Sequence, residues 1–303
     1  MKTTIAQRPK LVRFLRDANL YAPLRVVRGG FRADDVERWR ELRSFKRASG
    51  RMLTRNRGNH DGDTVLFVAC STPGLYRIRV EGMLAKALEQ RGARPVFVVD
   101  RHDVWHEEHL RAFGFRDFVF FDDHAPERAL VEARADELLA GCSTIRDVLA
   151  LEEHEYAVGF HAASRALNRL RRGSLDLAEP AVHEELSWAL ANSLAASLAA
   201  QSILADLQPD AQVATAQNLT PWAEFLEAGL RHGADTLYWM PAHVEDSLLL
   251  RRYSDETRHD HFFTLADETW ERVRAMTWSR EDAEALLASF ARSFFRWNQF
   301  PSV

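Results

Sequence analysis

Short, continuous apolar runs are the clearest feature of the first half of the chain. They cover residues 64–70, 95–99 and 117–121, and runs of this length are typical of parallel strands buried on both faces. Between them, residues 78–91 and 104–113 carry apolar side chains at helical spacing, and a glycine follows each segment. The alternation of strand and helix predicts a parallel sheet with right-handed crossovers.

The middle of the chain changes to helical periodicity alone. Four helices are predicted there, over residues 126–140, 144–153, 162–172 and 180–207. Strands return at residues 211–215 and 236–240, and the clearest later helix covers residues 281–295. The pattern therefore predicts an α/β fold: a Rossmann-like parallel sheet of about five strands flanked by helices, with a helical insertion over about residues 126–207.

Charge divides the chain into two parts. Residues 1–60 contain 16 Lys and Arg against 5 Asp and Glu, a balance of +11, whereas the remainder has a balance of −15. We interpret residues 1–60 as a basic N-terminal arm and residues 61–303 as the Rossmann-like domain. The arm either binds an anionic membrane surface or packs on the acidic domain. Nucleic acid is not an expected partner, because no recognised binding module accompanies the arm.

The sequence is typical of a cytoplasmic protein. Its two cysteines, Cys70 and Cys142, have neither disulfide-framework nor zinc-ribbon spacing. The N-terminus lacks an apolar core followed by a cleavage site, and the longest apolar stretch, residues 190–207, is too polar for a membrane span. We expect a cytoplasmic protein that lies at the inner face of the membrane if its basic arm binds lipid.

Ligands of open parallel sheets bind beyond the carboxyl ends of the strands. The first such loop, Thr72 to Arg77, contains Gly74 alone, whereas a dinucleotide fingerprint needs three glycines at fixed spacing. No phosphate-binding Gly-Lys-Ser/Thr loop occurs either, so we expect no cofactor. Arg77 begins the following helix and could bind an anionic group there, whereas Arg79 is expected to cover the surface.

Three histidines invite a metal interpretation. His102, His106 and His109 could share one helical face, with Asp103 or Glu107 as an oxygen ligand. However, zinc proteases use His-Glu-x-x-His, and this segment has His-Glu-Glu-His. We therefore expect a solvent-exposed helix face and no metal site.

Two histidines are candidates for a general base. His102 and His243 each follow a predicted strand, where a neutral imidazole could accept a proton from a hydroxyl group; the alternative for each is a hydrogen-bonded loop residue. Asp122 and Asp123 also follow a strand. Because neighbours in an extended segment point in opposite directions, we do not expect them to form a glycosidase pair.

Several segments resemble glycosyltransferases of the GT-B type. Leu66 to Asp100 is similar to their opening strand, small-residue loop and helix, ending in Arg-Gly-Ala-Arg-Pro before the second strand. Residues 159–176 resemble the helical insertion of capsule and surface-polysaccharide biosynthesis proteins. Residues 220–253 are similar to the segment of those proteins that leads to a Ser-Leu-Leu-Leu-Arg-Arg-Tyr helix, and residues 270–297 fit the same group.

This resemblance implies transfer of a sugar to a surface glycan or a lipid-linked acceptor. In such enzymes the N-terminal domain holds the acceptor and often the base, and the C-terminal domain binds the nucleotide sugar. The implied acceptor-binding residues are Thr72, Gly74, Tyr76, Arg77 and Asn218, and the implied catalytic residues are His102 and His243.

The resemblance covers the acceptor side alone. The sequence ends at Val303, where a second Rossmann domain would begin. A donor-binding domain is therefore expected on a longer or separate chain, unless catalysis has been lost. The alternative is a Rossmann-like domain that binds a glycan or a protein without catalysing a reaction.

Overall fold

The computed structural model describes residues 21–28, 32–55, 61–71, 74–242 and 247–297. Two predicted site residues, Thr72 and His243, lie outside these ranges. The chain divides into two compact units, Met1–His259 and Asp260–Val303, which we describe separately.

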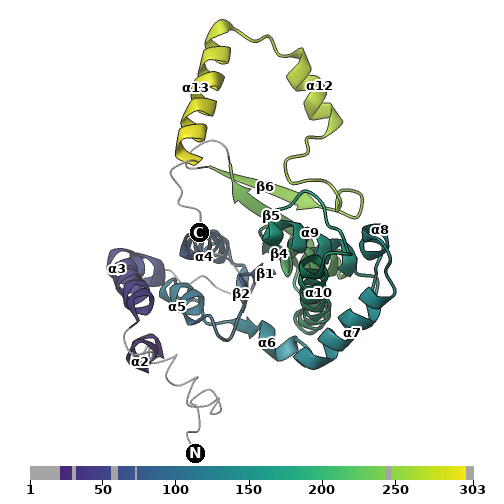
Figure 1. Cartoon of the computed structure of the whole chain (residues 1–303). Coiled ribbons are helices and arrows are strands. Elements are labelled where there is room, and N and C mark those ends of the chain that lie inside the picture. The colour runs from purple at the N-terminus through teal and green to yellow at the C-terminus, as the bar shows by residue number, and fades with distance from the viewer. Residues whose placement is uncertain (1–20, 29–31, 56–60, 72–73, 243–246, 298–303) are drawn as a thin grey trace, which may run out of the picture. The chain divides into compact units, whose positions relative to one another are not determined.

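The first unit contains a six-stranded sheet in the order β3-β2-β1-β4-β5-β6 (Figure 1). The strands are β1 (Thr64–Val68), β2 (Arg94–Val99), β3 (Phe118–Phe120), β4 (Ala211–Ala214), β5 (Asp235–Pro241) and β6 (Leu248–Tyr253). All neighbouring pairs are parallel except β5 and β6. The predicted α/β Rossmann-like fold is confirmed. Strand order reverses at β1, so the switch point of the sheet lies between β1 and β4.

Helices connect and cover the strands. Their bounds are α4 (Leu75–Glu89), α5 (Val104–Ala112), α6 (Phe121–His124), α7 (Arg128–Ala140), α8 (Ile145–Leu149), α9 (Val158–Leu170), α10 (Pro180–Leu207) and α11 (Trp222–Arg231). The four helices predicted in the middle of the chain correspond to α7, α8, α9 and α10.

Both faces of the sheet are buried, which explains the continuous apolar runs. On one face, Phe67 and Phe97 pack with Ile78 of α4 and with aromatic residues that follow α5. On the other face, the Trp222 indole of α11 donates a hydrogen bond of 3.2 Å to the carbonyl of Val68. Successive strand residues therefore meet protein on both sides, and the buried polar residues Gln212 and Thr236 are hydrogen-bonded to main-chain carbonyls.

Helix α10 is the one helix of the described chain that is long and apolar enough to cross a membrane. Of its most apolar window, 61% is buried in the structure. It packs against α6, α7, α9 and α11. Its apolar composition is thus explained by a central position among helices, as the sequence predicted.

The described part of the basic arm is helical. Helices α2 (Tyr21–Arg28) and α3 (Ala33–Arg55) pack with α5. Leu42 and Trp105 form a small buried cluster with residues of α2, and the Lys46 ammonium lies 3.1 Å from a carboxylate oxygen of Glu108. An apolar contact and an ion pair therefore both attach α3 to the sheet-covering helix α5.

The predicted helix over Ser-Leu-Leu-Leu-Arg-Arg-Tyr is wrong. Its residues form β6, which pairs antiparallel with β5. The pairing supplies partners to the backbone groups of a strand edge that would otherwise stay open. Arg252 also reaches the carboxylate of Asp235 at 2.7 Å, and Tyr253 is buried against Tyr238. Pairing with the strand that directly precedes it in sequence therefore outweighs the helix implied by the resemblance.

The second unit contains α12 (Asp267–Ala275) and α13 (Arg280–Trp297). Ser279 and Asp282 cap the start of α13: the Asp282 amide donates to the Ser279 hydroxyl at 3.1 Å, and that hydroxyl donates to the Asp282 carboxylate at 2.7 Å. This arrangement confirms the helix predicted near residue 281 and explains where it begins.

Candidate functional site

The candidate site lies at the switch point of the sheet. After β1 the chain continues into α4, and after β4 it continues into α11, whose residues pack on the opposite face. The two connections therefore leave the carboxyl ends of β1 and β4 toward opposite faces of the sheet, and this is the position where open α/β sheets bind ligands.

The loop after β1 is held by the end of β2. The Ser71 amide donates a hydrogen bond of 2.5 Å to Asp100, and Ala69 donates to the Val98 carbonyl at 3.0 Å. Ser71 and Gly74 both adopt left-handed backbone conformations, with φ of 54° and 81°. Glycine adopts such a φ without steric cost, so Gly74 lets the chain turn sharply into α4.

Arg77 connects the segments that follow β1 and β4. Its guanidinium lies 3.5 Å from the Thr215 hydroxyl, which follows β4, and also donates to the Tyr76 hydroxyl at 2.9 Å. Thr215 in turn donates to the carbonyl of Trp239 in β5 at 3.1 Å. A positive charge is thereby fixed at the switch point, beside the N-terminus of α4.

A fully buried carboxyl group lies one helical turn beyond Arg77. The Trp239 indole donates to one oxygen of Glu81 at 3.3 Å, and the other oxygen has no partner among the described residues. Burial raises the pKa of Glu81 to about 8, despite the opposing effects of Trp239 and Arg77. Glu81 therefore carries its proton at neutral pH and leaves the charge of Arg77 unneutralised.

The loop after β4 carries two amide side chains. Gln217 is buried and accepts a hydrogen bond from the Tyr253 hydroxyl of β6. Asn218 is half-buried on the same loop. A guanidinium and a hydroxyl thus meet at the switch point, and the two carboxamides follow the hydroxyl on the same loop. Such groups suit a ligand rich in hydroxyl groups.

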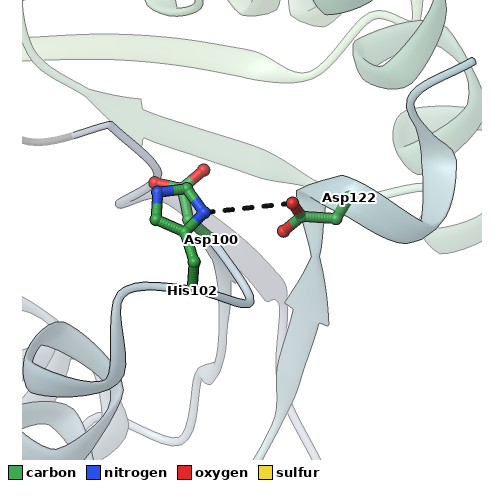
Figure 2. A group of neighbouring side chains, drawn as sticks. All are labelled: Asp100, His102 and Asp122. Carbon is green, nitrogen blue, oxygen red and sulfur yellow. Dashed lines mark ion pairs between the residues drawn. The ribbon is translucent and has the colours of Figure 1, made fainter. Parts of the chain in front are cut away.

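A second polar group lies at the ends of β2 and β3. Figure 2 shows Asp100, His102 and Asp122 turned toward one another. The His102 ring lies 4.0 Å from an Asp122 oxygen, and the other Asp122 oxygen accepts from the Arg101 amide at 2.6 Å. Burial raises the pKa of Asp100, the Ser71 hydrogen bond opposes this, and Asp122 raises it further.

The expectation of an extended segment at Asp122 and Asp123 is wrong. Both lie on the short helix α6 and not on an extended segment, and both reach Arg101. Asp122 accepts from the main chain of Arg101, and Asp123 pairs with its guanidinium. Because helical neighbours are separated by about 100°, their carboxylates can approach one residue from two sides.

The expectation of a solvent-exposed histidine face is also wrong. His102 precedes α5 and is exposed, whereas His106 and His109 are buried within it. Burial lowers the pKa of His109 to about 4, although its ring is hydrogen-bonded to the Trp105 carbonyl at 2.8 Å. The cover comes from α3, which was assigned to the arm; its Phe45 lies against the His109 ring.

A cavity of about 660 Å³ lies between α3, the start of α4 and α5. Its lining residues are Asp34, Glu37, Arg38, Glu41, Gly74, Leu75, Tyr76, Arg79, Asp103 and His106. Two predicted acceptor-binding residues, Gly74 and Tyr76, thus line this cavity. Arg79, expected to cover the surface, packs toward α3 and pairs with Glu41 at 2.7 Å.

The structure places the predicted residues at three positions. Arg77 and Asn218 lie at the switch point, Gly74 and Tyr76 line the cavity, and His102 joins the aspartates. Sequence reasoning missed two members of the site. Thr215 is recognisable as the polar residue that ends an apolar strand, and Glu81 as a carboxyl group on the inward face of a helix.

Comparisons of the chain with protein-family models, with curated proteins and with solved structures found no match. The functional proposal therefore rests on the residues and geometry of this chain.

Proposed function

We propose that the protein is a glycosyltransferase-like, acceptor-side protein that acts in surface polysaccharide or glycolipid biosynthesis. The arrangement of Arg77 and Thr215 across the switch point supports it most. A fixed guanidinium with neighbouring hydroxyl and amide groups can hydrogen-bond several sugar hydroxyls at once.

The first loop also favours a sugar over a dinucleotide. Its one glycine, Gly74, precedes α4, whereas a pyrophosphate requires close approach of the backbone at several positions. Side chains, and Arg77 first among them, are therefore the groups available to a ligand. Glu81 stays protonated at neutral pH, so the switch point retains the positive charge of Arg77.

The proposal includes a candidate base. His102 is 80% exposed and has Asp122 beside its ring, an arrangement that allows it to accept a proton from an acceptor hydroxyl. His243, the other candidate, lies outside the described residues. Acceptor binding at Arg77 does not depend on which histidine is the base.

Two further partners belong to this proposal. A donor-binding domain, on a longer or separate chain, would supply the nucleotide sugar. Residues 1–60 would attach the protein to an anionic membrane surface that presents a lipid-linked acceptor, because their excess of positive charge attracts such lipids. Sedimentation with anionic vesicles, compared between low and high salt, tests the second partner.

The test of acceptor binding uses the purified protein with a panel of short oligosaccharides and sugar nucleotides. Saturation-transfer NMR should detect oligosaccharide binding, and calorimetry should detect no nucleotide-sugar binding to this chain alone. Arg77→Ala should abolish the NMR signal. Arg94→Ala is the matched control, because Arg94 forms an exposed ion pair with Asp117 at the other end of β2. Equal binding by both variants would refute the proposed acceptor site.

Transfer itself separates an enzyme from a binding protein. With a donor domain and a sugar nucleotide present, His102→Ala should lower transfer by a factor of about 10²–10⁴ if His102 is the base. If the protein binds oligosaccharides but transfers no sugar from any sugar-nucleotide donor, a non-catalytic glycan-binding role would be favoured.

A further inference from the structure

We propose that Asp100, His102 and Asp122 form a binding site for a divalent transition-metal ion at the carboxyl ends of β2 and β3. This site goes beyond the proposed sugar-binding function and does not depend on it. Its residues come from two neighbouring strand ends, which the parallel pairing of β2 and β3 brings together.

The geometry suits a single ion. One ligand atom from each of the three residues lies within 4.8 Å of the other two. With metal–ligand bonds of about 2.1 Å, ligand atoms stand about 3–4 Å apart around one ion. The His102 side chain is 80% exposed and its ring lies 4.0 Å from an Asp122 oxygen. A small rotation of the ring can therefore bring its nitrogen within bonding distance of an ion held by the two aspartates.

Main-chain donors orient both carboxylates. The Ser71 amide holds one oxygen of Asp100, and the Arg101 amide holds one oxygen of Asp122. Each aspartate keeps a second oxygen for an ion, and hydrogen bonds of this kind fix the orientation of metal ligands in proteins.

Asp100 supplies an independent reason to expect a cation. Only 7% of this residue is exposed, yet the structure shows one hydrogen bond to its carboxylate, from Ser71, among the described residues. The nearby guanidinium of Arg101 pairs with Asp123 instead. A buried carboxylate beside a second aspartate costs free energy unless a positive charge compensates it.

The ligand types select the class of metal. Imidazole is a good ligand for zinc and related transition metals, whereas carboxylates are preferred by harder ions such as Mn²⁺. One histidine with two aspartates fits Mn²⁺ or Zn²⁺ better than Ca²⁺, which prefers oxygen ligands alone. Three protein ligands leave at least one position for water or for an oxygen of an anionic ligand.

Metal binding and the general-base role of His102 exclude one another at the same nitrogen. A nitrogen that binds the ion cannot accept a proton from an acceptor, and the metal-bound water, with its lowered pKa, would then be the base. Measuring metal binding without any sugar therefore tests this inference separately from the proposed function.

The experiment titrates the full chain with MnCl₂ and follows free Mn²⁺ by electron paramagnetic resonance, with ZnCl₂ as competitor. We expect one bound Mn²⁺ per chain, displaced by Zn²⁺. His102→Ala and Asp122→Asn should each weaken binding by at least about tenfold. Both side chains are substantially exposed, at 80% and 42%, so the fold should tolerate these changes.

Asp123→Asn is the matched control. Asp123 neighbours the site and pairs with Arg101, but it is not among the three ligands. The variant should keep the wild-type affinity for Mn²⁺. Absence of Mn²⁺ binding by the wild-type protein would overturn the inference, as would equal affinities in the wild type, His102→Ala and Asp122→Asn.

Discussion

The guanidinium of Arg77 lies 3.5 Å from the hydroxyl of Thr215, across the point where the strand order reverses. One residue belongs to the helix after β1 and the other to the loop after β4. A ligand bound at the switch point can therefore contact both residues at once.

This pairing predicts coupled effects on oligosaccharide binding. Arg77→Ala removes the charge, and Thr215→Val removes the hydroxyl while keeping the shape of the side chain. The double variant should lose less binding free energy than the sum of the single variants, by about 0.5 kcal/mol or more. Titration of all four proteins with one oligosaccharide measures the difference; strict additivity would show that the two residues act independently.

The raised pKa of Glu81 predicts that the protein becomes less stable as pH rises. Its pKa is about 8 in the folded protein, above the ordinary value of 4.5, so the folded state holds a proton that the unfolded state releases. Between about pH 6 and pH 9 the free energy of unfolding should fall by about 2–3 kcal/mol, at about 1.4 kcal/mol per pH unit up to the folded pKa.

Glu81→Gln should remove most of that fall, because glutamine does not titrate. Urea unfolding of both proteins at the two pH values is the measurement. Glu132→Gln serves as control, since Glu132 forms an exposed ion pair with Arg128. If the free energy of unfolding of Glu81→Gln falls with pH as much as that of the wild type, another titrating group causes the fall.

The buried ion pair of His161 and Glu227 predicts that substitution of His161 lowers the free energy of unfolding. Its ring lies 2.7 Å from a carboxylate oxygen of Glu227. Burial lowers the pKa of His161, but the Glu227 hydrogen bond and the charge of Glu224 raise it overall above 6.5. The contribution of His161 is thus complete below its ordinary pKa and is lost as pH rises through the folded value.

His161→Leu should destabilise the protein by about 1.5–3 kcal/mol at pH 6, because the buried Glu227 carboxylate loses a charged hydrogen-bond partner and keeps only the Ala157 amide and the more distant Arg231. His183→Leu, at an exposed position of α10, should change the free energy of unfolding by less than about 0.5 kcal/mol. The same urea experiment compares them, and similar losses in both variants would contradict a special role of the pair.

Substitution of Gly82 by a larger residue should cause a steric clash between α4 and the segment after α5. A Cβ atom at this position would lie 2.5 Å from the Phe113 ring. Gly82→Ala should destabilise the protein by about 1–3 kcal/mol, and adding Phe113→Leu should recover part of the loss. Gly173→Ala is the control, since a Cβ atom at Gly173 would have no neighbour within 4 Å among the described residues. Thermal unfolding of the three variants measures both effects.

The central strands and the long helices could be predicted because their patterns arise locally. The apolar runs around Phe67 and Phe97 identify strands buried on both faces, and the spacing in α10 identifies a helix. The segment ending in Tyr253 was assigned to a helix by resemblance, whereas it forms an antiparallel pair with β5, the strand directly before it. The burial of His109 was missed because its cover, α3, lies more than fifty residues earlier.

The candidate site was predicted less completely. The sheet rule identifies the loops, and Arg77 and Asn218 follow from it. It does not give side-chain direction, so the contact between His102 and Asp122 and the burial of Glu81 required the structure. A helix position alone does not tell whether a carboxyl group meets water or an indole.

The attachment of α3 to α5 has a consequence for anyone who shortens this protein. A chain that started at residue 61 would keep every strand of the sheet, yet it would lose one wall of the 660 Å³ cavity. It would also uncover Trp105 and leave Glu108 without Lys46. Such a truncated protein should bind hydrophobic dyes and aggregate, so the early helices are part of the folded body rather than a removable leader.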